Sequence, residues 1–341
     1  ARRRKAILKD ILEAVDAGRY EDGAQLCLER FNRRGEYWLY AARIGAELLL
    51  NLNRHEEARA LFDAVLATRA LPWAKLGVAR AQIESGEMAK AVRTLESLII
   101  EEPTYVDAYD VMGRARLELG DFEGAMDVYL KSVTLTPESI PRLQKAGMLA
   151  YYRGDLGEAA KCFDRAVRAG IGSKMFDWQT VVLLAFARFQ EGDSRGLQRC
   201  CDDLDAALAK AAQSQRLARF VRVVHALLLM LHQRHAEAAE TIRLLAAELD
   251  ATDFDVEAAS NMLTLLSMLA HTGMRIDGAE QWVDRVALRQ TGSKILTELL
   301  VRAAMTHPPF TERIQAAHAQ IGRLAEEAMG FALKGDPSKA V

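Results

Sequence analysis

The sequence predicts an all-α fold, a right-handed superhelical solenoid of antiparallel helix pairs, about eight or nine pairs long. A turn-like stretch ending in alanine recurs at Ala24, Ala58, Ala91, Ala125 and Ala159, at intervals of 34, 33, 34 and 34 residues. Each turn separates two amphipathic stretches of about 14 residues, a length typical of helices rather than strands. Hydrophobic residues make up 50% of the 341 residues and aromatics only 7%, with 7 prolines, a composition typical of helical proteins.

Residues of fixed size flank the repeated alanine. Four residues after it comes a large side chain, and this spacing places both on one helix face. Twelve residues before it stands a small residue, which lets the two helices of a pair approach closely. The large residues are Phe62, Leu95, Tyr129 and Phe163, and the small ones are Ala46, Ala79, Gly113 and Gly147.

Glycine followed by aspartate marks two of the turns. Gly120-Asp121 and Gly154-Asp155 predict a helix C-terminus followed by an N-cap, because glycine accepts a left-handed backbone and aspartate caps the next helix. Pro103 and Pro137 then each end one helix pair and start the next.

The second half of the chain repeats less regularly. Similar turns lead to Leu197, Ala238 and Ala279, at intervals of 38, 41 and 41 residues from Ala159 onward, which predicts longer helices in the same scheme. We therefore expect a regular array over residues 1–171, a divergent continuation over 172–333 and a frayed tail over 334–341. The stretch Gly170–Ser173 is either a hinge or a longer connection.

The order of small residue, Gly-Asp turn, alanine, aromatic and proline resembles the tetratricopeptide repeat (TPR) family over about residues 18–171. A narrower resemblance lies in residues 70–80 and 136–144, which look like the repeat region of bacterial response regulators with an N-terminal receiver domain. In that family the receiver supplies the phosphoacceptor aspartate. This chain has no α/β segment of the required length and starts without methionine, so the resemblance implies the output half alone, cut from a longer protein.

In TPR arrays the first helix of each pair lines an inner groove. The resemblance places these residues there: Tyr40, Arg43, Glu47, Trp73, Arg80, Asp107, Asp110, Arg114, Gln144, Met148 and Tyr152. Mixed charged and aromatic side chains suit a protein or peptide partner better than a ligand with one sign of charge. As an alternative, Arg80 and Arg114 pair with Asp110 and Glu47 across adjacent helices and have only a structural role.

Charge and composition exclude several other partners. The chain carries 45 lysines and arginines against 47 aspartates and glutamates, and a net charge of −2 offers no electrostatic reason to bind nucleic acid or an anionic membrane. No apolar stretch is long enough to span a bilayer. Four cysteines form no disulfide framework, so we expect a reducing cytoplasm.

The sequence contains no recognisable catalytic motif, and it predicts no enzyme, no cofactor and no metal site. His225, His232 and His235 could share a helix face, but we expect solvated or capping roles for them. Cys200–Asp205 gathers thiols and carboxylates, and we expect these acids to lie near a helix start and favour its dipole. Glycine-serine-lysine stretches at 172–174 and 292–294 lack the spacing of a phosphate-binding loop.

The sequence therefore predicts a non-enzymatic protein-interaction module, the output region of a two-component response regulator. Two alternatives stay open: a peptide-pheromone receptor, and a scaffold for a pilus, secretion or envelope assembly. Whether the array forms a homodimer also stays open.

Overall fold

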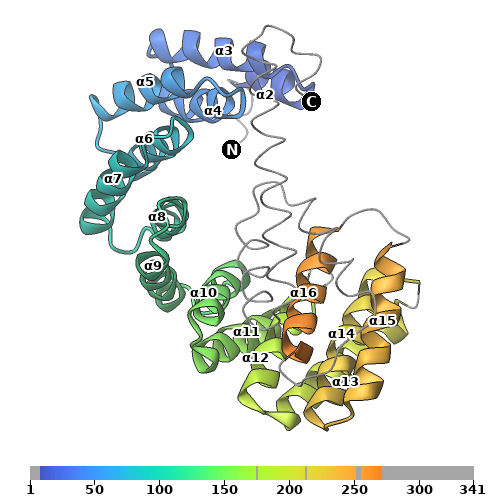
Figure 1. The fold of residues 1–341 in the computed structure, drawn as a ribbon. Coiled ribbons are helices and arrows are strands. Elements are labelled where there is room, and N and C mark those ends of the chain that lie inside the picture. Colours follow the sequence, from blue (N-terminus) through green and yellow to red (C-terminus); the bar gives the residue numbers. More distant parts are fainter. Residues whose placement is uncertain (1–7, 174–175, 212, 251–254, 271–341) are drawn as a thin grey trace, which may run out of the picture. The chain divides into compact units, whose positions relative to one another are not determined.

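A computed structural model describes residues 8–173, 176–211, 213–250 and 255–270 (Figure 1). Every regular element within these ranges is an α-helix, which confirms the predicted fold class. The helices fall into two compact units that divide after Gly154. The first unit holds α2 (Lys9–Asp16), α3 (Tyr20–Asn32), α4 (Trp38–Asn51), α5 (His55–Leu66), α6 (Pro72–Glu84), α7 (Met88–Glu101), α8 (Val106–Glu118), α9 (Phe122–Leu135) and α10 (Ile140–Arg153). The second holds α11 (Leu156–Gly170), α12 (Gln179–Glu191), α13 (Ser194–Lys210), α14 (Gln215–Leu231), α15 (His235–Asp250) and α16 (Val256–Ala270).

Consecutive helices pack against one another within each unit, as a stack of helix pairs requires. The even-numbered helices open each repeat and are called the first helices, and the odd-numbered ones are the second helices. First helices also pack against the next first helix: α4 against α6 and α6 against α8 in one unit, α12 against α14 and α14 against α16 in the other. The first helices therefore form the inner layer of each unit.

The described ranges hold seven helix pairs in sequence order, α2 to α15, and the first helix of an eighth. The predicted turn leading to Ala279, the predicted helix ending at about Leu333 and the tail over 334–341 lie outside the described residues. The division of the array at residue 171 stays a prediction. The helices α13, α14 and α15 have 17, 17 and 16 residues, whereas those of the first unit have 8 to 14.

The predicted turn chemistry is confirmed at the Gly-Asp pairs. Gly120 and Gly154 have φ angles of 76° and 87°, in the left-handed region that glycine adopts without steric cost. The carboxylate of Asp121 accepts a hydrogen bond from the backbone N–H of Gly124 at 2.9 Å, and Asp155 accepts one from Glu158 at 3.2 Å. Each aspartate thus satisfies one of the free N–H groups at the start of a second helix.

The repeated small and large residues form the core. All five repeated alanines are at most 1% exposed, as are Phe62, Leu95, Tyr129 and Phe163. A Cβ atom added to Gly113 would lie 2.4 Å from the ring of Tyr129, so only glycine allows α8 and α9 to pack this closely. The predicted role of the small residues is confirmed at this position.

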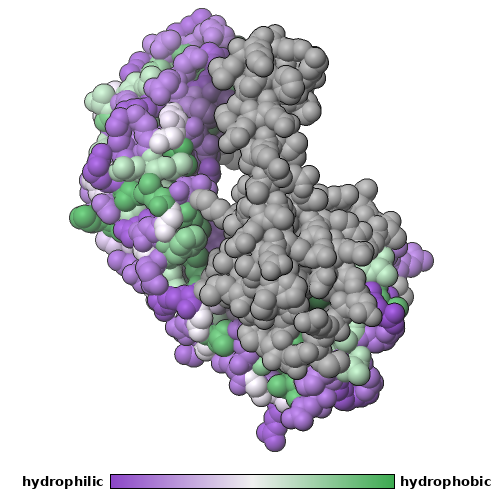
Figure 2. All heavy atoms as spheres, in the orientation of Figure 1, coloured by the Kyte–Doolittle hydropathy of each residue, from purple (hydrophilic) through white to green (hydrophobic). Residues whose placement is uncertain are grey.

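The surface of the described residues is mainly hydrophilic in the view of Figure 2, with smaller apolar patches between the charged side chains. None of the helices in the described ranges is long and apolar enough to cross a membrane. All four cysteines are buried and free.

Candidate functional site

The predicted groove residues all lie on first helices of the first unit. Tyr40, Arg43 and Glu47 are on α4 and Trp73 and Arg80 on α6. The remaining residues divide between two helices: Asp107, Asp110 and Arg114 are on α8, and Gln144, Met148 and Tyr152 on α10. The side chain of Tyr152 lies outside the described part of the structure.

Charged residues of this layer pair with one another from one first helix to the next. Arg80 donates to Glu47 at 2.6 and 2.7 Å, Arg114 to Glu84 at 2.7 Å, and Arg142 to Asp110 at 2.6 to 3.1 Å. We call these three pairs the ion-pair ladder. Of the expected structural pairings, Arg80 with Glu47 is confirmed. Arg114 and Asp110 instead pair with residues that the sequence analysis missed, Glu84 and Arg142.

The rungs of the ladder differ in exposure and therefore in strength. The side chains of Arg114 and Glu84 are 56% and 39% exposed, and such surface pairs contribute about 0 to 1 kcal/mol. Arg142 and Asp110 are 17% and 31% exposed, and two guanidinium nitrogens contact the carboxylate. A forked, half-buried pair of this kind is stronger and geometrically more specific.

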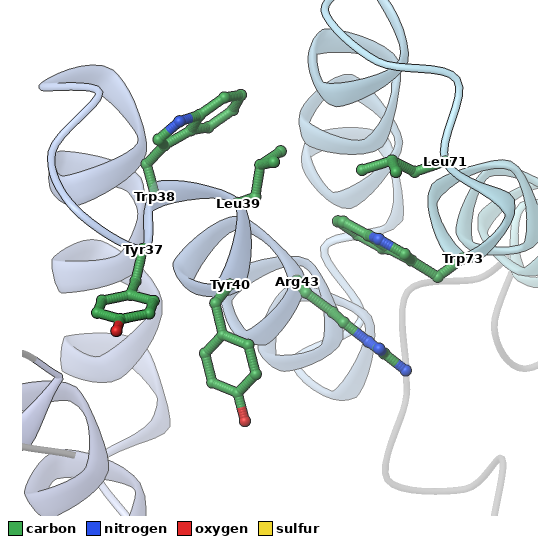
Figure 3. A pocket seen from close by; sticks show the side chains of 7 residues that line it. All are labelled: Tyr37, Trp38, Leu39, Tyr40, Arg43, Leu71 and Trp73. Atoms are coloured by element: carbon green, nitrogen blue, oxygen red, sulfur yellow. The ribbon is translucent and has the colours of Figure 1, made fainter. Parts of the chain in front are cut away.

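A cavity of about 450 Å³ lies at the start of α4 and α6, and we call it the aromatic pocket. It is lined by Tyr37, Trp38, Leu39, Tyr40, Arg43, Leu71 and Trp73. Figure 3 shows the Tyr37 and Tyr40 rings extending in the same direction from the start of α4, while Arg43 extends toward Trp73 of α6. Tyr40, Arg43 and Trp73 are among the predicted groove residues, whereas the other four are not.

Two residues of the loop before α4 have an unusual backbone, and one of them, Tyr37, lines the pocket. Arg34 and Tyr37 have positive φ angles of 49° and 60°, which cost about 1 to 2 kcal/mol for residues other than glycine. The guanidinium of Arg34 lies 4.4 Å from the ring centroid of Phe31 and 4.1 Å from that of Trp38. This stacking packs the loop against the end of α3 and the start of α4.

Arg43 is positioned by Trp73, which lies on the α6 side of the pocket. Its guanidinium lies 5.7 Å from the ring of Trp73, whose edge packs on Phe62 with ring centroids 6.2 Å apart. Burial raises the pKa of the Tyr105 phenol, Asp107 raises it further, and Arg43 acts in the opposite direction. The start of α8 therefore lies within electrostatic range of Arg43.

The other clusters considered in the sequence do not converge on a site. His225 lies 3.1 Å from Asp205, and His232 lies 3.3 Å from Ser194. Within the described ranges, no three His, Cys, Asp or Glu side chains are arranged to hold a metal ion. The glycine-serine-lysine stretch at 172–174 is described only to residue 173, and the one at 292–294 lies outside the described ranges.

Comparison with known proteins agrees with the repeat geometry. Residues 76–140 match the tetratricopeptide repeat family. This segment carries tetratricopeptide repeats. Repeats of this family commonly form scaffolds that bind proteins and peptides.

Several known proteins resemble parts of this TPR chain. The Photosystem I assembly protein Ycf3 of Acaryochloris marina is 34% identical over 91 residues, 26% of this chain and 54% of that protein. The chain thus spans about half the length of the curated relative that it matches. A TPR protein from Parabacteroides merdae has a TM-score of 0.44 at 15% identity, covering 78% of this chain and 99% of that one. MamA from Desulfovibrio magneticus has a TM-score of 0.42 at 21% identity, covering 50% and 96%.

Proposed function

We propose that the chain is the non-enzymatic output region of a two-component response regulator, whose inner helix layer in the first unit binds a protein partner. The observation that supports partner binding is the aromatic pocket, where Tyr40, Arg43 and Trp73 meet on neighbouring first helices. Tyrosine, tryptophan and arginine are the side chains that most often dominate the affinity of protein interfaces. The signalling role is supported by the resemblance of residues 70–80 and 136–144.

In this proposal, phosphorylation of a receiver domain changes how the array is presented to its partner in the cytoplasm. The test is a pull-down from the native cytoplasm with the full-length protein in its phosphorylated and unphosphorylated states. We expect a partner that is retained in one state and lost in the other. Equal retention in both states, or a gene that encodes no receiver domain, contradicts the signalling role.

Charge reversal in the inner layer tests the surface itself. The double variant Arg80→Glu with Arg114→Glu leaves Glu47 and Glu84 beside like charges, and we expect it to weaken partner retention at least tenfold. Arg93→Glu on α7 is the matched control, because Arg93 is exposed on a second helix. Equal retention by both variants contradicts binding in this layer.

A second candidate is an assembly scaffold. It is favoured by the similarity of 91 residues to a protein named for the assembly of Photosystem I. This function predicts a stoichiometric complex that co-purifies whatever the phosphorylation state. The same pull-down therefore distinguishes the two candidates.

A further inference from the structure

The aromatic pocket is lined by one charged side chain, that of Arg43, and no described residue of the inner layer forms an ion pair with it. On the first helices α6, α8 and α10, the arginines Arg80, Arg114 and Arg142 each pair with a carboxylate of the preceding first helix. Arg43 occupies the corresponding layer on α4, and in the described part of the chain it has no ion-pair partner. The nearest carboxylate on α4, Glu47, is already paired with Arg80.

The preceding helix explains why the ladder stops here. The acidic residues of α2 are Asp10, Glu13 and Asp16; Asp10 pairs with Arg30 at 3.9 Å and Glu13 with Lys9 at 3.5 Å, and none of the three forms an ion pair with Arg43 in the described part of the chain. Arg43 therefore rests on the face of Trp73, which orients its guanidinium without neutralising the charge.

A ligand that fills this pocket covers the rings of Tyr40 and Trp73 and the guanidinium of Arg43. The volume of about 450 Å³ falls within the roughly 300 to 1,000 Å³ of ordinary ligand pockets. A wholly apolar ligand would leave the charge of Arg43 buried without a partner, which is unfavourable. The ligand that fits brings an anion beside its apolar group, and a carboxylate matches the planar fork of arginine.

We propose that the aromatic pocket is a subsite for a protein segment in which a bulky apolar side chain, aromatic or aliphatic, stands beside an aspartate or glutamate. The apolar side chain enters between Tyr40 and Trp73, and Arg43 receives the carboxylate. This inference rests on the proposed role of the inner layer in binding protein, and it adds the chemistry of the bound segment.

The backbone of the pocket supports the same reading. Tyr37 retains a left-handed conformation that costs stability, and both Tyr37 and Tyr40 line the pocket. Strain of this kind persists where the surrounding structure fixes it, and such positions cluster at binding sites.

The experiment is a selection of displayed random peptides on the full 341-residue chain. We expect the wild type to enrich peptides with an aromatic or bulky aliphatic residue next to an acidic one. A parallel selection on Arg43→Glu should enrich lysine or arginine in place of the acid, because the charge of the subsite is reversed. The chain should keep its fold, since Arg43 is exposed on α4.

A selected peptide then serves as the probe for affinity measurements by fluorescence anisotropy. Loss of one charge-assisted contact predicts binding about tenfold to a hundredfold weaker for Arg43→Glu. Tyr40→Ala, at a residue that is 38% exposed, tests the apolar wall and should also weaken binding about tenfold. Arg93→Glu makes the same charge change on α7 and should leave the affinity within about twofold.

The outcomes separate this proposal from the proposed function. Enriched peptides without an acidic residue, or peptides whose affinity is the same for wild type and Arg43→Glu, overturn the subsite while leaving peptide binding by the array in place. The absence of any enriched peptide on the wild type contradicts the subsite and peptide binding together. Perturbation of the indole N–H signal of Trp73 in an NMR spectrum by the probe places the peptide at the pocket, and an unchanged signal overturns the assignment.

Discussion

The inner layers of the two units differ in what they leave open. In the first unit, the ion-pair ladder joins each first helix to the next, and the aromatic pocket at α4 and α6 stays open beside Arg43. In the second unit, hydrogen bonds reach across three first helices. Gln179 of α12 and Asn261 of α16 exchange two amide hydrogen bonds of 2.9 and 3.0 Å.

Arginines on α14 reinforce this closure in the second unit. Arg216 donates to Asp177 at 2.9 Å and to Glu257 at 2.8 Å, and Arg219 donates to Asp255 at 3.3 Å. These arginines and the amide pair thus link α14 to the start of α16 and α12 to α16. Among the described residues, the inner layer of the second unit is thus bridged by hydrogen bonds, whereas that of the first unit contains the aromatic pocket.

The largest effect should come from the core position shared by the two units. Phe62 and Phe163 follow the repeated alanine in the same way and are 1% and 0% exposed. Replacing either by alanine should cost about 3 to 5 kcal/mol of unfolding free energy. Because repeat arrays couple mainly through neighbouring helices, Phe163→Ala should speed hydrogen exchange in α11 and α12 more than in α4 and α5. Equal acceleration throughout would contradict this local coupling.

The amide pair should contribute the next largest effect. Asn261 is 3% exposed, so Asn261→Leu removes both hydrogen bonds and leaves the amide of Gln179 without its partner. We expect a loss of about 1 to 3 kcal/mol in urea unfolding. The double variant with Gln179→Leu should recover most of this loss, because no unsatisfied amide remains. A double variant that is as unstable as the sum of the single ones argues against the pairing.

Alkaline pH should lower the stability of the second unit more than that of the first, by a smaller amount than the substitutions above. Burial raises the pKa of Cys27, Cys200 and Cys201 to about 12 and that of Cys162 to about 11, from an ordinary value of 9.0. An unfolded thiol ionises first, so this stability is fully present below pH 9 and is lost as the pH rises toward these values. One thiol belongs to the first unit and three to the second, so hydrogen exchange should accelerate more in the second unit.

A thiol variant supplies the control. Cys200→Ala should reduce the loss of stability between about pH 9 and pH 10 by about 1 kcal/mol. An unchanged slope of stability against pH in this variant would show that Cys200 ionises as readily in the folded state as in the unfolded one.

The exposed pair of the ladder, Arg114 with Glu84, should give the smallest change. Arg142→Ala breaks the half-buried fork with Asp110 and should cost about 1 to 2 kcal/mol, whereas Arg114→Ala should cost less than about 1 kcal/mol. Thermal unfolding at low and high salt measures both, and salt should diminish the Arg114 effect more. An equal loss of stability in the two variants would mean that the strength of these ion pairs does not depend on their exposure.

The repeat architecture could be predicted because its signals are local and periodic. The alanines, the large residues four positions later and the Gly-Asp turns each carry a steric or hydrogen-bonding meaning within one repeat. The partner of Arg114 could not be predicted in this way. Glu84 and Asp110 both stand within one repeat of it, and the choice depends on how adjacent helices are offset along their axes.

The pocket was only half predictable for a related reason. Tyr40, Arg43 and Trp73 follow from the helix register, whereas Tyr37 depends on a loop conformation that non-glycine residues rarely adopt. Leu71 precedes Pro72 at the start of α6, outside the helical positions that the register assigns. Loop residues with no glycine signature give no warning of a left-handed backbone.

The stacked guanidinium of Arg34 also bears on how fast a partner can bind. A loop held between Phe31 and Trp38 need not search for its bound conformation after the first encounter. Association should then be governed by diffusion and orientation, at about 10⁵ to 10⁷ M⁻¹s⁻¹ as for other preformed interfaces. Differences in affinity among partners should appear almost wholly in how long each one stays bound.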